Sequence, residues 1–409
     1  MIRVLLITLL WFTTTPTAHA QRGRGPVLDA QRLASAFRQR AWTIQEGKIR
    51  IVSDIDPDTR GETFAKTRWL FSTIELVFDG MRTRRPSDGV EVFYAGDRND
   101  YLSLIAVEAK ADGSNTAGMA EYGGRRTMLF VKGLAWRTIQ HEAWHASRSV
   151  FIPDMPTWLD EGVAEVFEHG TFLEDQFVIG GVGADDLARV RALFETDTWV
   201  PLGRFIRTDD GWNRRVREGS VQGIAQYVQA WAICHFLLFA DDGEHRARLN
   251  TFLRAMNAGR DEWQAFDAAI GANDRSVAAL DREVRKFFET ARPVDPGRTY
   301  TMLLEWAEEV ATTFPDRGRI DLAPIASSLV EHLADEEHGP HRREIEDDAV
   351  SMKAGRGGRG PVVSLGPIDG LGWAITWTKN DRRRRPDRDR ADAGEEPTWI
   401  PSVRWSLGG

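Results

Sequence analysis

The chain has 409 residues, 42% of them hydrophobic, and a formal net charge of −8. This length and composition are typical of a globular protein with more than one core, and the acidic balance excludes a general nucleic-acid binder, which would present a basic face. The single cysteine, Cys234, rules out an intramolecular disulfide within the chain; it lies in an apolar segment and is expected to be a buried, unreactive hydrophobic residue.

The first 20 residues have the order of features of a secretory signal peptide. Arg3 supplies the positive charge, residues 4–12 form an apolar run, and Ala18-His19-Ala20 is a small-x-small cleavage site. The apolar run is shorter than the ~20 residues that span a bilayer. We predict cleavage after Ala20 and a secreted or periplasmic protein without a stable membrane span; a short N-terminal membrane anchor is the alternative.

Strand-like and helix-like segments alternate in the region that follows. Polar and apolar residues alternate over 48–52, as in a half-buried strand, and 90–94 and 127–131 have the composition of two further strands. A helix is predicted over about 64–78. We therefore expect an α+β fold, in which a small mixed β-sheet with helices packed on it leads directly into a helix over 134–150.

Helical periodicity dominates after residue 168. Helices are predicted over 184–195, 220–240, 245–257 and 277–291. Pro293 and Pro296 interrupt this run and indicate a boundary. Residues 21–170 are interpreted as a sheet-containing subdomain that carries the histidine helix, and residues 171–295 as a helical subdomain that completes the cleft.

The signals are weaker toward the end of the chain. Two helical stretches, near 302–313 and 325–333, are expected to form an appended region over 296–350. Residues 351–409 are interpreted as a Gly/Arg-rich linker and a tail. Two tryptophan-containing segments of the tail could form a β-hairpin, 373–377 and 399–405.

The string His141-Glu142-Ala143-Trp144-His145 has the form HExxH. Histidines at positions i and i+4 lie on one face of a helix and can bind the same zinc ion at about 2.0–2.1 Å. Glu142 is not a ligand in this arrangement; it is placed to take a proton from metal-bound water. An apolar stripe from Trp136 to Val150 would pack on the sheet, and the helix must end before Pro153.

A catalytic zinc ion takes three protein ligands and leaves one position for water. Between His145 and Glu161 lie 15 residues, enough for the chain to turn back and begin a new helix. Thr157 and Asp160 form an N-cap pair of the capping-box type, which would place Glu161 in the first turn of that helix, near the histidine helix. Glu161 is the predicted third ligand.

Glu165 follows Glu161 by one helical turn and lies on the same face of the predicted helix. Metal-bound histidines nearly always donate their second N–H to a carboxylate or carbonyl group. We predict that Glu165 accepts such a hydrogen bond from His141. The alternative is an ordinary surface glutamate of an acidic helix.

These residues resemble the gluzincin branch of the zinc metallopeptidases, which includes the thermolysin and aminopeptidase N families. The HExxH string is followed by Trp158-Leu159-Asp160-Glu161-Gly162, similar to the WL-x-EG segment of that branch. Residues 156–165 are similar to the PxWLxEGxAE string of the bacterial peptidase-MA-like proteins. The resemblance covers roughly residues 48–291 and implies a zincin-like fold, a Zn²⁺ cofactor and Glu161 as the third ligand.

The same resemblance implies a role for Tyr227. Aminopeptidase-N-like enzymes stabilise the oxyanion with the tyrosine of a Y-x-x-G-x-x-x-L motif; here Ala230 replaces the glycine. Tyr227 is thus either the oxyanion donor or a core aromatic residue of an amphipathic helix. His235 is expected to be a buried structural histidine. Residues 118–121 are similar to the exopeptidase motif but lack its asparagine, so aminopeptidase activity is not implied.

The expected activity is hydrolysis of a peptide or protein substrate by a metal-activated water, with Glu142 as general base and Tyr227 as oxyanion donor. A strand edge near 127–131 is expected to hold the extended substrate by main-chain pairing. Two alternatives remain open. The protein could be a non-catalytic, zinc-stabilised extracytoplasmic binding protein, which would have no use for Glu142, or a metal-dependent amide hydrolase of the cell envelope.

Overall fold

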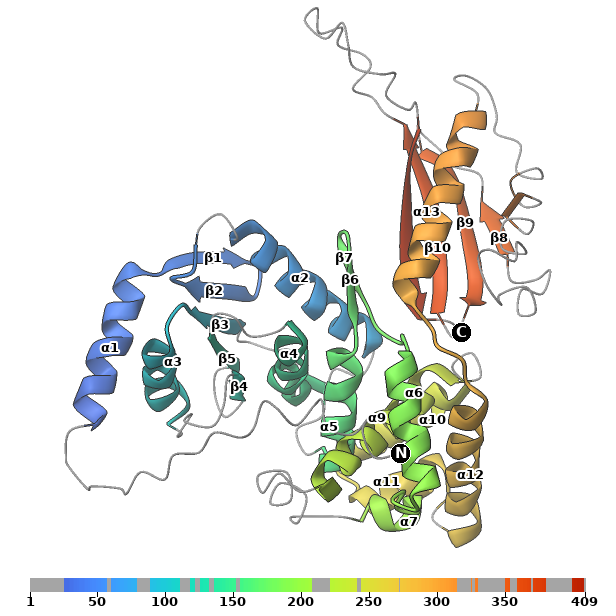
Figure 1. Cartoon of the computed structure of the whole chain (residues 1–409), viewed down its shortest axis with the longest axis horizontal. Helices are drawn as coiled ribbons and strands as arrows, with labels where there is room; N and C mark the ends of the chain where they lie inside the picture. The colour runs from blue at the N-terminus through green and yellow to red at the C-terminus, as the bar shows by residue number, and fades with distance from the viewer. Residues whose placement is uncertain are drawn as a thin grey trace, which may run out of the picture.

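The computed structural model has the predicted α+β fold (Figure 1). It describes residues 26–56, 60–78, 89–110, 118–121, 126–131, 136–151, 155–207, 221–240, 244–271, 273–314, 325, 328–329, 350–353, 359–368, 371–379 and 399–407. The predicted signal peptide and most of the helix predicted near 325–333 lie outside these residues. Within the described part of the chain, no helix is both long and apolar enough to cross a membrane.

A five-stranded mixed sheet, with strand order β1-β2-β3-β5-β4, forms the centre of the N-terminal half. Its strands are β1 (Trp42–Glu46), β2 (Ile49–Ser53), β3 (Val90–Ala95), β4 (Gly118–Glu121) and β5 (Arg126–Val131). β2, β3 and β5 are parallel, whereas β1 and β4 are antiparallel to their neighbours. The three predicted strands are confirmed as β2, β3 and β5.

The position of β5 corrects one expectation. β5 lies between β3 and β4 and is hydrogen-bonded on both sides, so it is not an edge that a substrate could pair with. Among the described strands, the outer strand on this side of the sheet is β4, which the sequence does not predict as a strand. Its four residues, beginning with Gly118, are too few to show the alternation that marks a strand.

Helices cover both faces of this sheet (Figure 1). One core contains α1 (Pro26–Arg40), α3 (Arg98–Leu104) and the π-helical turn Ile105–Ala109; the other contains α2 (Arg60–Val77) and α4 (Trp136–Phe151). Alternating strand residues divide between them: Val52, Phe93 and Leu129 join the first core, and Ile51, Val92 and Met128 the second. Each fully buried large side chain contributes about 1.5–3 kcal/mol, so the histidine helix α4 rests on a firmly packed sheet.

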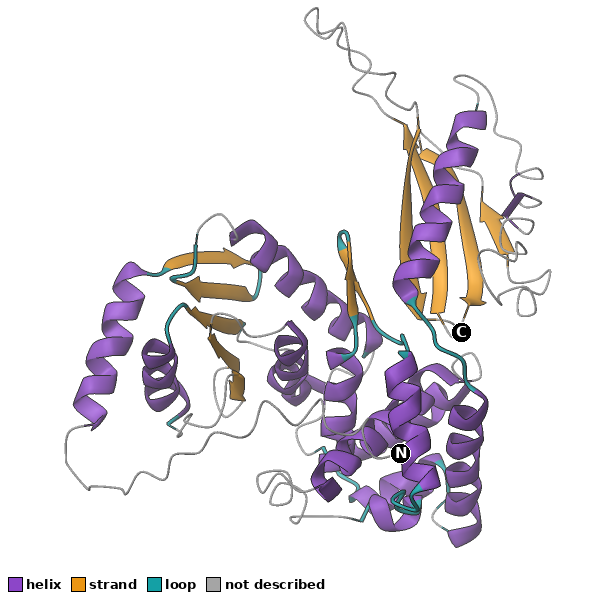
Figure 2. Ribbon diagram, in the orientation of Figure 1, coloured by secondary structure: helices purple, strands orange, loops and turns teal. Residues whose placement is uncertain are grey.

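The second region is mostly helical, as predicted (Figure 2). Its elements are α5 (Thr157–Glu168), β6 (Thr171–Leu173), β7 (Gln176–Val178), α6 (Ala184–Glu195), α7 (Leu202–Phe205), α9 (Val221–Phe239), α10 (Glu244–Asn257), α11 (Glu262–Ala269) and α12 (Asp274–Thr290). The four predicted helices correspond to α6, α9, α10 and α12. The β6–β7 hairpin is not predicted, because its three-residue strands are too short to show a period.

The last region is an α+β unit, which we call the C-terminal module. It consists of α13 (Pro296–Thr313), β8 (Val350–Lys353), β9 (Arg359–Ile368), β10 (Leu371–Lys379) and β11 (Trp399–Leu407). The strands form an antiparallel sheet in the order β11-β10-β9-β8. The predicted hairpin is confirmed, with Trp373 opposite Trp405.

The module also corrects the expected division at residue 350. α13 packs against the sheet, with the rings of Trp306 and Trp377 5.9 Å apart, so the appended helix and the tail share one core. β9 begins at Arg359, inside the segment interpreted as a linker. The glycines and arginines of 355–360 suggested a solvated linker because composition alone does not reveal that the next strand pairs with distant partners.

Candidate metal centre

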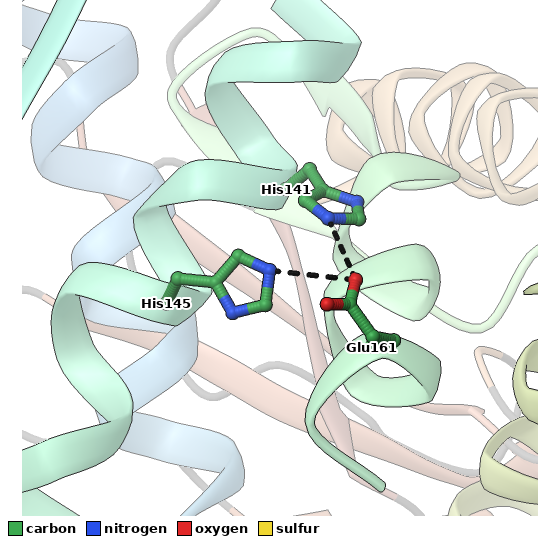
Figure 3. A group of neighbouring side chains, drawn as sticks. All are labelled: His141, His145 and Glu161. Atoms are coloured by element: carbon green, nitrogen blue, oxygen red, sulfur yellow. Dashed lines mark ion pairs between the residues drawn. The ribbon is translucent and has the colours of Figure 1, made fainter. Parts of the chain in front are cut away.

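The helix α4 carries both histidines of the HExxH string. Ile139, Ala143 and Ala146 form its buried stripe, whereas His141 and His145 are only partly buried. The two imidazole rings face the same side, with centroids 4.9 Å apart (Figure 3). The helix ends at Phe151, before Pro153, as the sequence predicts.

The helix α5 carries Glu161, but it does not begin in the predicted way. Its N-cap is Pro156, without a side-chain hydrogen bond, so the proposed cap pair of Thr157 and Asp160 is wrong. Glu161 is the fifth helical residue and lies just beyond the first turn. The pair does not form because the Asp160 carboxylate is buried and bonded to α4 instead.

Gly162 explains how α5 lies so close to α9. A Cβ atom on Gly162 would come within 2.5 Å of Cys234 Sγ and 2.6 Å of the Ala230 carbonyl oxygen. Only glycine permits this approach of two helix backbones. The packing places Tyr227 of α9 beside the metal-binding residues, with its ring centroid 6.4 Å from that of His141.

Three predicted ligands meet between α4 and α5 (Figure 3). Glu161 Oε2 lies 3.4 Å from His141 Nε2 and 3.7 Å from His145 Nε2. These three side chains could hold a metal ion, since one ligand atom from each lies within 4.8 Å of the others. A tetrahedral ion with bonds of about 2.0–2.2 Å needs ligand separations of roughly 3.3–3.6 Å. The donor set therefore fits such an ion with little movement.

The outer nitrogen of each histidine is held by a different carboxylate. His141 Nδ1 lies 2.9 Å from Glu168 Oε2, and His145 Nδ1 lies 3.0 Å from Asp160 Oδ1. When each Nδ1 carries the proton and donates it, each Nε2 is left with a lone pair directed at the common point near Glu161. This is the tautomer that metal binding requires.

The prediction that Glu165 holds His141 is wrong. Glu165 Oε1 is 3.5 Å from His141 Nδ1, beyond a normal hydrogen bond, whereas Glu168 is at hydrogen-bond distance. Glu161, Glu165 and Glu168 follow one another at i, i+4 and i+7 on one face of α5, so all three reach toward α4. The sequence shows that the three glutamates share a face. Their spacing alone does not tell which carboxylate accepts the hydrogen bond from His141.

Asp160, expected at the helix cap, instead binds the histidine helix. Besides His145, its carboxylate accepts a hydrogen bond from Trp144 Nε1 (3.0 Å) and forms an ion pair with Arg148 Nε (2.9 Å). All three partners lie on α4, so Asp160 ties the two ligand helices together. A buried carboxylate is tolerated here because it is fully paired.

The carboxylates also control the charge of the histidines. Burial lowers the pKa of His145, but its hydrogen bonds to Asp160 and Glu161 outweigh burial and raise the pKa to about 9. The pKa of His141 is raised in the same way, and the two histidines lower the pKa of Glu161 against the effect of its burial. Burial and a neighbouring carboxylate raise the pKa of Glu165 to about 7. The cluster therefore favours positive charge at the position where a divalent cation would replace the protons.

Two further predicted residues have simple environments. His235 is buried, with Nε2 3.1 Å from the Gly180 carbonyl oxygen, and burial lowers its pKa to about 4, as expected of a structural histidine. Cys234 is fully buried, and burial raises the pKa of its thiol. Glu142 follows His141 directly on α4 and is partly buried.

Comparison with known families matches part of the chain. The model of a family described as a protein of unknown function (DUF1570) matches residues 135–256. This segment spans α4 to nearly the end of α10 and contains every residue predicted for the metal centre, but it is less than half of the chain and its description assigns no activity. No curated protein matches the sequence.

Proposed function

We propose that this protein is an exported zinc metallopeptidase of the gluzincin type. The observation that carries the proposal is the orientation of the two histidines. Both Nε2 atoms face Glu161, and both Nδ1 atoms are held by carboxylates that are not themselves in the ligand set. An oriented His₂Glu set with carboxylate partners is the ligand set of catalytic zinc in peptidases.

A zinc ion held by His141, His145 and Glu161 would supply an acidified water and a Lewis acid for the substrate carbonyl. Glu142 accepts the proton of the attacking water and delivers it to the leaving amine, so the carboxylate is regenerated in each turnover. Tyr227 donates its phenolic O–H to the oxygen that becomes negative in the tetrahedral intermediate. Glu168 and Asp160 keep the imidazoles in one tautomer throughout.

The substrate would lie along β4. Of the two outer strands among the described residues, β1 and β4, it is β4 that packs against α4: a Cβ atom on Gly118 would be 3.2 Å from Thr138 Cγ2, near the start of the histidine helix. An extended peptide that pairs with β4 by main-chain hydrogen bonds would therefore run alongside the metal centre. Substrate pairing with an edge strand next to the site distinguishes a peptidase from an amide hydrolase that acts on small molecules.

Glu142→Gln tests the mechanism. The variant keeps the size of the side chain but cannot take up a proton, so we expect cleavage of an unfolded protein substrate to fall by roughly 10²–10⁴-fold, the usual contribution of a general base. Zinc content, measured by atomic absorption, should remain at one ion per chain. The exposed Glu195→Gln on α6 is the matched control.

Two outcomes would overturn the proposal in different ways. Undiminished cleavage by Glu142→Gln with zinc still bound would exclude Glu142 as the base. Stoichiometric zinc in a wild-type protein that cleaves neither proteins nor small amides would instead support the non-catalytic binding protein.

A further inference from the structure

The imidazole of His141 has a second set of possible metal ligands on its outer edge. Nε2 faces Glu161, whereas Nδ1 lies on the other edge of the ring (Figure 3). Around Nδ1 lie Glu168 Oε2 at 2.9 Å and Glu165 Oε1 at 3.5 Å. One ligand atom from each of these three side chains lies within 4.8 Å of the others, so this group could hold a metal ion of its own.

The helix α5 presents the two carboxylates of this group together. Glu165 and Glu168 are three residues apart and therefore share a face of the helix. Their side chains are 17% and 29% exposed, and that of His141 is 13% exposed, so all three are shielded but not sealed from solvent. One imidazole nitrogen and two carboxylate oxygens, completed by water, are ligands that suit Mn²⁺ as well as Zn²⁺.

The arrangement with a single ion does not use Glu165. In that arrangement Glu161 binds the ion and Glu168 accepts the hydrogen bond from His141. Glu165 Oε1, at 3.5 Å, is too far from Nδ1 for a normal hydrogen bond. A partly buried carboxylate is costly unless it is well paired. A cation between Glu165 and Nδ1 would give this carboxylate a direct partner.

The charge of the cluster also favours a second cation. Glu161, Glu165 and Glu168 place three carboxylates within 3.5 Å of the ring nitrogens of His141. One divalent ion neutralises two of these negative charges. The third remains close to the imidazole, where the partly buried surroundings screen it less than bulk water would.

Two cationic side chains act on Glu168 from a greater distance, His169 and Arg137. His169 is already paired with Asp186, with Nε2 and Oδ1 3.2 Å apart. Arg137 is exposed, so solvent and salt weaken its attraction. A divalent cation at Nδ1 would interact with the carboxylates much more strongly than either side chain, because it carries twice the charge at a shorter distance.

We propose that Glu165, Glu168 and Nδ1 of His141 form a second, weaker site for a divalent cation, so that the imidazole bridges two ions. The second ion takes the place of the proton on Nδ1, which passes to the solvent. The three glutamates and the resulting imidazolate carry four negative charges, which balance two divalent ions. The site is the weaker of the two because its ion must displace this proton.

Manganese binding to protein that already holds one equivalent of Zn²⁺ tests the proposal. Mn²⁺ binds such ligands more weakly than Zn²⁺ and does not displace it. Loss of the electron paramagnetic resonance signal of free Mn²⁺ counts the bound ions. We expect one Mn²⁺ per wild-type chain and an affinity at least about tenfold lower in Glu165→Gln, because ligand charge determines the affinity of oxygen-rich sites. The exposed Glu195→Gln on α6 should bind like wild type.

Two further measurements separate the loss of a ligand from the loss of the fold. Glu165→Asp keeps the carboxylate and should bind Mn²⁺ more tightly than Glu165→Gln, with the same far-UV circular dichroism as wild type. In the wild-type protein itself, pulsed electron paramagnetic resonance should detect coupling of the bound Mn²⁺ to an imidazole nitrogen.

The second site is wrong if the zinc-loaded wild type binds no Mn²⁺, if the bound Mn²⁺ shows no coupling to nitrogen, or if Glu165→Gln binds it undiminished. None of these results depends on cleavage of a substrate. Manganese bound in this way to a protein that cleaves nothing would refute the peptidase and leave the second site standing.

Discussion

The contacts between α4 and α5 join buried polar groups that are close in the sequence. The contacts in the C-terminal module join aromatic side chains to residues that are far away in the sequence. Asp160 is 15 residues from His145 and 16 from Trp144. In the module, the indole of Trp377 donates to the Ala307 carbonyl, 70 residues away, and stacks edge-on against Trp306.

The two regions are therefore sensitive to different changes. A buried carboxylate or imidazole is tolerated only while it is paired, so the metal centre should respond to the loss of one charge or one hydrogen bond. The module has no buried charged side chain among its described residues, so it should respond to the loss of volume. Substitutions in each region should separate metal affinity from stability.

The largest effect is expected from Trp377→Ala in the module. Trp377 is 1% exposed and contacts both Trp306 and Phe314, so its removal should cost about 3–5 kcal/mol of unfolding free energy through lost burial and a cavity. Denaturant unfolding of the full chain measures this cost, and the exposed Thr378→Ala on the same strand is the control. Zinc affinity should be unchanged; a parallel loss of zinc would mean that the two regions are not separable.

Gly162→Ala should affect stability and metal binding together. The added methyl group would meet the Ala230 carbonyl oxygen and Cys234 Sγ, forcing α5 away from α9 at a cost of roughly 1–3 kcal/mol. Because Glu161 is the preceding residue, zinc affinity should fall as well. Gly61→Ala on α2 has no atom within 4 Å of the new Cβ and should be neutral or stabilising by up to ~1 kcal/mol. Equal unfolding midpoints for the two variants would contradict this close approach.

Glu168→Gln and Glu165→Gln distinguish the observed partner of His141 from the one that spacing suggests. Glu168 holds His141 Nδ1 at 2.9 Å, so its loss should weaken zinc binding by about 10–100-fold, the usual effect of removing a partner of a metal-bound histidine. Glu165, at 3.5 Å, should have a smaller effect. Competition with a fluorescent chelator measures both affinities, and a larger loss in Glu165→Gln would identify Glu165 as the partner of His141 after all.

The sequence predicts the local parts of this site well for a physical reason. An i, i+4 histidine pair and a following glutamate on a second helix are readable because helical spacing determines which side chains share a face. The way α5 crosses α4 determines whether Glu165 or Glu168 bonds to His141. It also determines that Asp160 bonds to α4 and does not cap α5. That crossing is determined by tertiary contacts such as Gly162 against α9, which no local period reveals.

The same limit explains the errors elsewhere in the fold. β2, β3 and β5 are predicted because each alternates or is continuously apolar, whereas β4, β6 and β7 have only three or four residues. In the C-terminal module, the tryptophans indicate the hairpin of β10 and β11, but not that α13 covers the sheet. A contact across 70 residues leaves no periodic signal in either segment.

The smallest effects are expected where the β6–β7 hairpin touches the C-terminal module. The buried Gln176 of β7 accepts a hydrogen bond from Trp405 N (3.2 Å) and donates one to the Val403 carbonyl (3.0 Å), so its amide replaces a neighbouring strand at the edge of β11. The exposed side chains of Arg404 and Asp175 form an ion pair beside it. We expect Gln176→Ala to destabilise the chain by roughly 1 kcal/mol, because water can reach the edge strand and replace part of what is lost.

Arg404→Ala should cost less, between about 0 and 1 kcal/mol, because an exposed ion pair is screened by solvent and salt. Limited proteolysis of the full chain, followed by mass spectrometry, should show faster cleavage at the contact of the β6–β7 hairpin with β11 in Gln176→Ala than in Arg404→Ala. The opposite order would mean that charge rather than strand-edge pairing holds the module against the hairpin. Zinc affinity should stay the same in both variants if the contact between β7 and β11 stabilises the module alone. A lower zinc affinity in Gln176→Ala would show that this contact also affects the end of α5.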